Sequence, residues 1–323
     1  MSVDFTLSAY RQLLSALQQS DYAFHTFEEW CQGKAVGRYV LLRHDVDLKA
    51  GRSLVTATIE AEMGIRATYY FRIVPQSNQP EIIRAIAALG HEIGYHYEDV
   101  SLFNGDMDKA FDHFKAQLAY FRQFYPVKTI CMHGSPTSKF DNRDLWKLND
   151  YRELGVLGEP YLDFLSSPAA LNGDIAYFTD TARMWDGGKY NVRDKSVISQ
   201  QSSVISQQSS VISQQLSVIS QQSSVISHQS SVISPEKSEC SDSRNVEILH
   251  HKLENELSVI SSKKKTIHST YDFIEYINNK PVENGMMITT HPQRWTDKPL
   301  SWLHELVFQN IKNNIKKMLV VRQ

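Results

Sequence analysis

The sequence predicts an α/β fold, a parallel sheet or barrel that is interrupted by a low-complexity insertion. Three observations support this prediction. Short apolar runs alternate with amphipathic helical patterns along most of the chain. Several of these runs end in histidine and acidic residues. A seven-residue repeat rich in serine and glutamine separates the last predicted strand and helix from the others.

The predicted strands and helices follow one another in a regular order. The pairs are 40–42 with 53–63, 67–71 with 80–89, 92–95 with 107–125, 128–132 with a helix near 145, and 286–289 with a terminal helix from about 300 to 317. An amphipathic helix is also expected around 7–17. In a fold of this kind the carboxyl ends of the strands meet on one face, which carries the chemistry.

Residues 195–265 form the predicted insertion between two parts of one barrel, 1–194 and 266–323. The repeat is Ser-Val-Ile-Ser-Gln-Gln-Ser, and a degenerate copy returns at Ser258–Ser261. Val and Ile are adjacent in each copy, so they cannot form the a and d seam of a coiled coil. Serine and β-branched residues are poor helix formers. We therefore expect a disordered or β-prone segment that is dispensable for chemistry.

Length and charge are compatible with one large unit that acts on a small molecule. The chain has 323 residues, and α/β barrels of about 200 to 250 residues often form a single domain. It has 34 Lys plus Arg and 36 Asp plus Glu, so the net charge of -2 indicates no nucleic-acid or membrane partner. A small-molecule or carbohydrate substrate is expected, and the oligomeric state stays open.

The chain is expected to be cytoplasmic. Its N-terminal segment carries an acid and lacks the basic region of a signal peptide. No segment approaches the roughly 18 consecutive apolar residues of a membrane span. The three cysteines, Cys31, Cys131 and Cys240, are odd in number and lack metal-type spacing, so we expect reduced thiols.

The most informative motif is Arg43-His44-Asp45-Val46-Asp47, which follows the apolar run Tyr39–Leu42. Charges at the end of a buried strand must be paired, solvated or metal-bound. Alternation sends Asp45 and Asp47 to the same side, where they repel unless a cation or a shared proton relieves them. In the alternative interpretation Asp47 caps the next helix, and Arg43 or Arg52 neutralises Asp45.

Histidines and acids recur at the other predicted strand ends, including Asp180. The histidines are His44, His96, His133 and His291. Several such residues on one face predict a metal or acid–base site. Oxygen and nitrogen ligands suit Zn, Mn, Fe, Co or Ni, and the metal would polarise a carbonyl and lower the pKa of bound water. A carboxylate base and a histidine acid would complete hydrolysis of an amide or ester.

At these residues the chain resembles the polysaccharide deacetylase, or NodB-like, superfamily of carbohydrate esterases, over about 39–295 without the repeat. The most specific match is Gly90-His91-Glu92-Ile93-Gly94-Tyr95-His96, which differs from the family segment Gly-His-Glu-Ile-Gly-Asn-His only at Tyr95. The paired aspartates of the family's first strand are matched by Asp45 and Asp47, here separated by Val46. The resemblance implies a distorted (β/α) barrel of the deacetylase type.

The resemblance also implies a role for each matching position. Asp45 corresponds to the base, Asp47 to a metal ligand and His96 to the first metal histidine. His291 resembles the histidine that protonates the leaving group. His91 is expected to pack beneath the site, because its family counterpart is not a ligand.

One ligand of the family is missing from this chain. The second metal histidine of the family corresponds to Val100, so Glu98 or His133 is the expected replacement unless the metal is absent. The family's Arg-x-Pro-Tyr-Gly segment corresponds loosely to Cys131–Pro136, without its arginine. These departures indicate a divergent bacterial subgroup.

Two Arg and Trp pairs are candidate substrate contacts: Arg183 with Trp185, and Arg294 with Trp295. Aromatic faces and guanidinium groups suit carbohydrate surfaces, so the pairs are expected to line a sugar site. The alternative is that they form cation–π contacts that brace loops.

The sequence therefore predicts a metal-dependent hydrolase, resembling polysaccharide deacetylases, that removes an N- or O-acyl group from a sugar or related amide. Zinc is the expected cofactor, and Co, Mn, Fe or Ni are the other candidates. Two alternatives stay open: a hydrolase of a non-sugar C–N bond, and a metal-free glycan-binding pseudoenzyme. Val100 favours the pseudoenzyme, whereas a binding protein has no need of the repulsive pair Asp45 and Asp47.

Overall fold

The computed structural model describes residues 3–134, 138–172, 174–185, 267–279 and 284–320, together with positions 210, 214 and 217. The chain divides into two compact units. One comprises Met1–Ile198 with Ile267–Gln323, and the other comprises Ser199–Thr266. Apart from those three positions, the predicted insertion at 195–265 lies outside the described residues.

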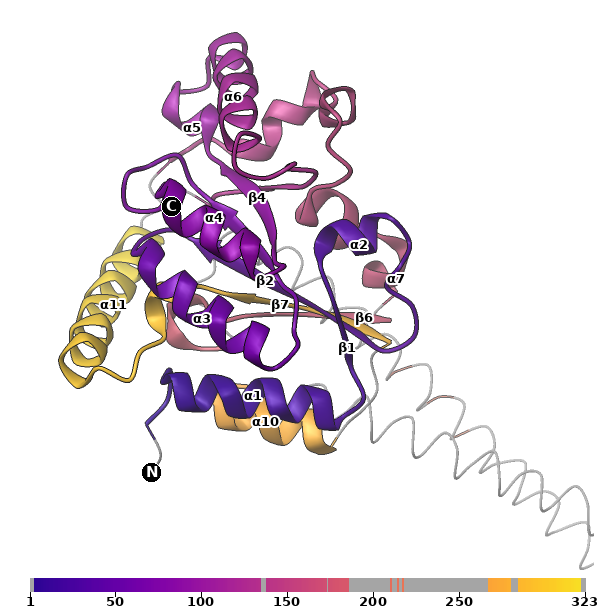
Figure 1. Cartoon of the computed structure of the whole chain (residues 1–323), viewed down its shortest axis with the longest axis vertical. Helices are drawn as coiled ribbons and strands as arrows, with labels where there is room; N and C mark the ends of the chain where they lie inside the picture. The colour runs from indigo at the N-terminus through magenta and orange to yellow at the C-terminus, as the bar shows by residue number, and fades with distance from the viewer. Residues whose placement is uncertain are drawn as a thin grey trace, which may run out of the picture. The chain divides into compact units, whose positions relative to one another are not determined.

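The first unit contains a curled parallel sheet with the strand order β5-β4-β3-β2-β7-β6 (Figure 1). A further strand, β1, pairs with β2. The strands are β1 (Ala23–His25), β2 (Tyr39–Val46), β3 (Thr68–Phe71), β4 (Glu92–Tyr97), β5 (Ile130–Met132), β6 (Ile175–Thr179) and β7 (Gly285–Thr290). All six ladders are parallel, so the predicted α/β fold with a parallel sheet is confirmed.

The central strand β2 extends beyond its predicted end. Its first half pairs with β1 and its second half with β3, while β7 runs along the other side. Neighbouring strands pair with both edges of β2, and all eight of its residues are buried. The strand continues past Leu42 to Val46, so the acidic motif lies largely inside the strand.

Helices connect and cover the strands. The α-helices are α1 (Leu7–Gln19), α2 (Phe27–Cys31), α3 (Ala50–Glu62), α4 (Pro80–Ala88), α5 (Asp99–Leu102), α6 (Met107–Phe121), α7 (Pro168–Leu171), α10 (Thr270–Asn279) and α11 (Pro299–Val320). The short helical turns are η1 (Asn142–Lys147), η2 (Tyr151–Leu154), η3 (Pro160–Phe164), η4 (Thr181–Arg183) and η5 (Pro292–Arg294). None of the described helices is long and apolar enough to cross a membrane.

Local sequence signals explain where several helices begin. The Thr6 side chain accepts a hydrogen bond from the Ala9 amide at the start of α1, and Asp106 accepts one from Lys109 at the start of α6. Helices α1 and α10 lie side by side although they are far apart in sequence (Figure 1). Strand β7 pairs with both β2 and β6, so segments from both sides of the repeat build one sheet.

Alternation along β2 separates two chemically different faces of the sheet. Asp45 points towards His96 and His291, and we call this side the site face. His44 points in the opposite direction, towards Glu60 of α3, and we call that side the helix face. Consecutive polar residues of one strand therefore belong to different clusters.

Candidate metal centre

Three side chains from different elements converge on the site face. Asp47 follows β2, His96 lies near the end of β4, and His133 follows β5. Asp47 Oδ1 lies 3.6 Å from His96 Nε2 and 3.5 Å from His133 Nε2. One ligand atom from each residue lies within 4.8 Å of the other two. Parallel strands bring their carboxyl ends together, which explains the convergence of residues so distant in sequence.

The hydrogen bonds of the two imidazoles determine which ring nitrogen carries the proton. His96 Nδ1 lies 2.9 Å from the Cys131 carbonyl oxygen, and His133 Nδ1 lies 2.9 Å from Glu98 Oε2. Both partners can only accept, so each Nδ1 donates and each Nε2 presents a lone pair towards Asp47. Asp47 Oδ1 is buried without a hydrogen-bond partner. With both imidazoles in their neutral form, two ring nitrogens turn lone pairs towards a carboxylate oxygen that has no donor, an arrangement that fits a cation.

The protonation states also suit metal binding. Burial lowers the pKa of His96 to about 4, so this imidazole is neutral at neutral pH. Burial alone would raise the pKa of Asp47, but the neighbouring His133, His291 and His96 lower it below its ordinary value. His96 is therefore present as a neutral imidazole and Asp47 as a carboxylate, the forms in which these groups bind metals.

Glu98 lies behind His133 and does not join the three converging atoms. Its Oε1 atom accepts hydrogen bonds from Arg72 Nε at 2.9 Å and Nη2 at 2.5 Å, while Oε2 faces His133. Burial would raise the pKa of Glu98, but His133 and Arg72 lower it to about 2. The structure thus corrects the expectation that Glu98 is a direct ligand: it orients His133. Val100 is completely buried in α5.

Asp45 is paired with Arg43 and lies beside the three ligands. The Arg43 guanidinium donates from Nε and Nη2 to the two Asp45 oxygens, at 2.8 and 2.7 Å. Burial alone would raise the pKa of Asp45, but Arg43 and then His96 lower it far below its ordinary value. Asp45 Oδ2 is 3.7 Å from His96 Nε2. The predicted neutralisation by Arg43 is therefore confirmed.

The alternative role of Asp47 as a helix cap is wrong. Lys49 is the N-cap residue of α3, and no side chain forms the cap hydrogen bond. Arg52, the other candidate partner of Asp45, donates instead to the Gln293 carbonyl oxygen. Asp47 accepts one hydrogen bond from Gln293 Nε2, at 3.2 Å to Oδ2, which leaves Oδ1 turned towards the imidazoles.

His291 approaches the cluster from the end of β7. Its Nε2 atom lies 3.8 Å from Asp47 Oδ2, and its Nδ1 atom is 2.6 Å from Asp180 Oδ1. Asp180 also accepts from the His291 backbone amide, Arg294 Nη1 and Trp295 Nε1, at 3.0, 2.6 and 3.0 Å. From the sequence, Asp180 is recognisable only as a strand-end residue. The sequence signal for a role beside His291 is the position of Asp180 directly after β6, because β6 lies next to β7, the strand that precedes His291.

The two Arg and Trp pairs do not form an open sugar-binding wall, and that expectation is corrected. Trp185 and Trp295 are only 3% and 1% exposed, so neither ring offers a face to a ligand. The Arg183 guanidinium lies over Phe5, 4.7 Å from the ring centre, as in the bracing alternative. Arg294 is bound to Asp180. These residues pack the N-terminal segment and the turns after β6 and β7.

His91 and the groove on α1 lie outside the cluster. His91 accepts from the Ala67 amide and contacts the Ala57 carbonyl through Nε2, so it is a neutral structural residue, as predicted.

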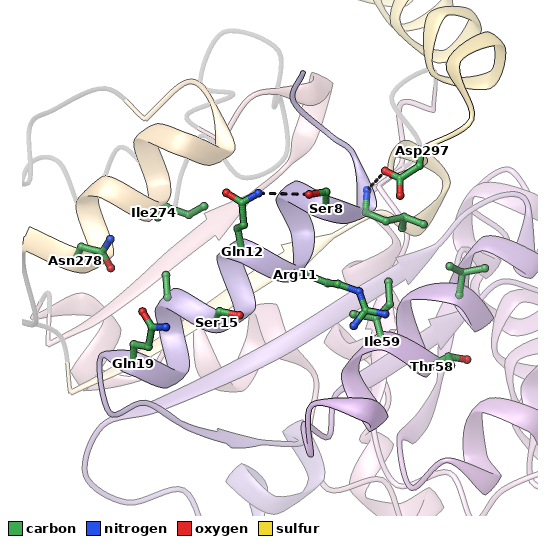
Figure 2. Close-up of a pocket in the computed structure, with 13 residues that line it drawn as sticks. Ser8, Arg11, Gln12, Ser15, Gln19, Thr58, Ile59, Ile274, Asn278 and Asp297 are labelled. Atoms are coloured by element: carbon green, nitrogen blue, oxygen red, sulfur yellow. Dashed lines mark hydrogen bonds between the residues drawn. The ribbon is translucent and has the colours of Figure 1, made fainter. Parts of the chain in front are cut away.

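A groove of about 800 Å³ crosses α1 between α3 and α10 (Figure 2). None of the converging ligands lines this groove, and its Arg11 is paired with Glu62.

Comparison with known proteins adds no assignment. No protein-family model, no curated protein and no solved structure matches the chain. The chemistry of the candidate site is therefore argued from its own geometry.

Proposed function

We propose that the protein is a metal-dependent hydrolase that removes an acyl group, as the polysaccharide deacetylases do. The observation that supports this proposal is the convergence of one ligand atom each from Asp47, His96 and His133, with both imidazoles hydrogen-bonded through Nδ1 to other groups. A structural cluster in a protein core normally matches each acceptor with a donor, because an unmatched buried polar atom costs about 1–3 kcal/mol. A divalent ion removes this penalty.

Each surrounding residue then has a role in hydrolysis. An ion held by these three residues would polarise the acyl carbonyl and lower the pKa of the attacking water. Asp45, kept ionised by Arg43, is placed to accept the proton of that water. His291, oriented by Asp180, is placed to deliver a proton to the departing amine or hydroxyl. The products are the free amine or alcohol and a carboxylate.

The glycan-binding alternative is less well supported than hydrolysis. The indoles expected to stack on a sugar, Trp185 and Trp295, are buried. The fit of the ligand atoms to a cation also argues against a metal-free binding protein. Hydrolysis is therefore the activity that the site supports better.

Elemental analysis of the purified full chain tests the proposal. The wild type, Asp47→Asn and His133→Gln are compared after chelation and re-addition of Zn, Co, Mn or Ni. His113→Gln serves as the control, because His113 lies on α6 and contacts Asp99. We expect one ion per chain in the wild type and the control, little Mn in the two ligand variants, and acetate release from N- or O-acetylated sugars to follow the metal. A wild type that binds no ion under any condition overturns the proposal.

A further inference from the structure

A second set of metal-ligand atoms lies deeper on the site face. Asp45, His96 and Cys131 each offer one ligand atom, and these atoms lie within 4.8 Å of one another. The residues are 5%, 2% and 0% exposed, and Cys131 is outside any disulfide. His96 and Cys131 are direct neighbours across the ladder between β4 and β5, which fixes their separation. We call this set the inner position, and Asp47, His96 and His133 the outer position.

The two positions share one ligand. Both include His96, whose Nδ1 is 2.9 Å from the Cys131 carbonyl oxygen. Only Nε2 of that imidazole can therefore bind an ion, whichever position is filled. A nitrogen lone pair coordinates one metal at a time, so the two positions exclude each other.

The donor atoms of the two positions favour different ions. The outer position offers one carboxylate and two imidazoles, whereas the inner position replaces one imidazole with a sulfur atom. Thiolate is a soft ligand that selects soft or borderline ions, while Mn²⁺ prefers oxygen and nitrogen ligands. We propose that Asp45, His96 and Cys131 form a second metal position, specific for thiophilic ions such as Cd²⁺, whose occupation empties the outer position.

Binding at the inner position releases one proton and raises the charge of the cluster by one unit. The Cys131 thiol loses its proton to solvent as the sulfur–metal bond forms, so one divalent ion replaces one proton. The Asp45 carboxylate already neutralises Arg43, so the thiolate supplies the only new negative charge at the ion. Arg43 already donates to both Asp45 oxygens, but each carboxylate oxygen has a further lone pair to offer. Arg43 thus stays in place and disfavours ions that cannot gain a strong bond to sulfur.

Occupation of the inner position has a regulatory consequence that rests on the proposed function. The ion would take both Asp45, the proposed base, and His96, a ligand of the outer position. A thiophilic ion would therefore inhibit the hydrolase even where a catalytic ion is abundant. The binding itself does not depend on the protein being a hydrolase.

Titration of the full chain with Cd²⁺ tests the inner position. Cys31→Ser and Cys240→Ser are introduced first, so that Cys131 is the only thiol in the chain. The thiolate-to-cadmium absorbance in the ultraviolet and the bound cadmium are measured, with circular dichroism as the check on folding. We expect one Cd²⁺ per chain with the thiolate band. Adding Cys131→Ser should abolish the band and weaken Cd²⁺ binding at least about 10-fold, whereas adding His133→Gln should preserve both.

Manganese separates this inference from the proposed function. Mn²⁺ binding should be lost with His133→Gln, unaffected by Cys131→Ser, and displaced by one equivalent of Cd²⁺. If Cys131→Ser leaves Cd²⁺ binding unchanged, or if Cd²⁺ and Mn²⁺ bind at the same time, the inner position is overturned. The outer position is not affected by either result. A thiolate band in a chain that binds no Mn²⁺, Zn²⁺, Co²⁺ or Ni²⁺ at the outer residues overturns the proposed function and keeps the inner position.

Discussion

Two buried polar clusters lie on opposite faces of the same strands, and they differ in how their protons are matched. On the helix face, Glu60 accepts from the hydroxyls of Tyr10 and Tyr69, and His44 Nε2 lies 2.8 Å away. On the site face, Asp47 Oδ1 faces two imidazole nitrogens and has no donor. The His44 and Glu60 side chains are completely buried, whereas those of Asp47 and His133 remain 20% and 15% exposed, respectively. Partial exposure and a carboxylate oxygen without a donor therefore distinguish the site face from the helix face.

The largest expected effect is on metal binding, and it tests the contrast directly. His96→Gln removes one of the converging ligand atoms. Losing a residue that only hydrogen-bonds to a metal ligand lowers metal affinity by up to about 100-fold, so losing the ligand itself should lower it by more than that. His91→Gln, five residues earlier in the chain and on the helix face, should leave affinity unchanged, because both of its ring nitrogens already contact backbone groups. Equilibrium dialysis with elemental analysis measures both variants. Equal losses in the two would remove the distinction between the faces.

The second-largest expected effect is on the unfolding free energy of the metal-free chain. Glu60→Ala strips the partner from His44 and from two tyrosine hydroxyls, and breaking a buried ionic network costs about 3–5 kcal/mol of unfolding free energy. Asp47→Asn in the metal-free chain removes a charge that the neighbouring histidines favour, but the side chain accepts only one hydrogen bond, so the loss should be smaller, about 1 kcal/mol. Urea unfolding of chelated protein compares them. Destabilisation by Asp47→Asn equal to that of Glu60→Ala would show that the site face is also structural.

The sequence predicted the parallel sheet well, because hydrophobic runs and their alternation with helices are local patterns. It also placed Asp47, His96 and His133 together, since strand ends converge in such folds. The roles of Glu98 and of the two tryptophans are harder to predict from the sequence. Which side chain reaches a shared point depends on rotamers and partners, and here Arg72 holds Glu98 back. No one-dimensional pattern reports that contact.

The exposure of aromatic side chains could not be predicted from the sequence either. Trp295 follows a polar strand end and has the composition of a binding loop, yet Phe5 and Tyr10 pack against it, with ring centres at 4.9 and 5.1 Å. Those contacts come from residues nearly 300 positions away in the chain. Long-range packing of this kind, unlike periodicity, needs the fold before it can be predicted.

The third prediction concerns Glu92, a buried acid on the site face whose carboxyl group accepts hydrogen bonds from three residues. Burial raises the pKa of Glu92 to about 7, although hydrogen bonds from Thr129, the Glu28 amide and Thr68 oppose the rise. Between its ordinary pKa of 4.5 and the raised value, the folded chain keeps a proton that the unfolded chain loses. The contribution of Glu92 to stability is therefore complete below that range and falls by about 3 kcal/mol as pH rises through it, then stays constant.

Glu92→Gln sharpens the comparison, because the amide cannot ionise. Urea unfolding between about pH 5 and pH 8 should show a smaller loss of stability in this variant than in the wild type. Metal affinity at neutral pH should be unchanged, since Glu92 lies at the start of β4 and His96 near its end. Identical pH profiles for the two proteins would show that the folded chain does not raise the pKa of Glu92. A loss of metal in the variant would show that this acid also serves the metal centre.

The smallest expected effect tests whether an oriented imidazole matters as much as the ligand itself. Glu98→Gln keeps an acceptor for His133 Nδ1 but removes the charge that fixes the ring, so metal affinity should fall by about 10- to 100-fold. Asp99→Asn is the matched control, because this neighbouring acid contacts His113 and Tyr95. Dialysis against one metal buffer compares both with the wild type. If Glu98→Gln binds metal as tightly as the control, the position of His133 is set by its backbone and not by its carboxylate partner.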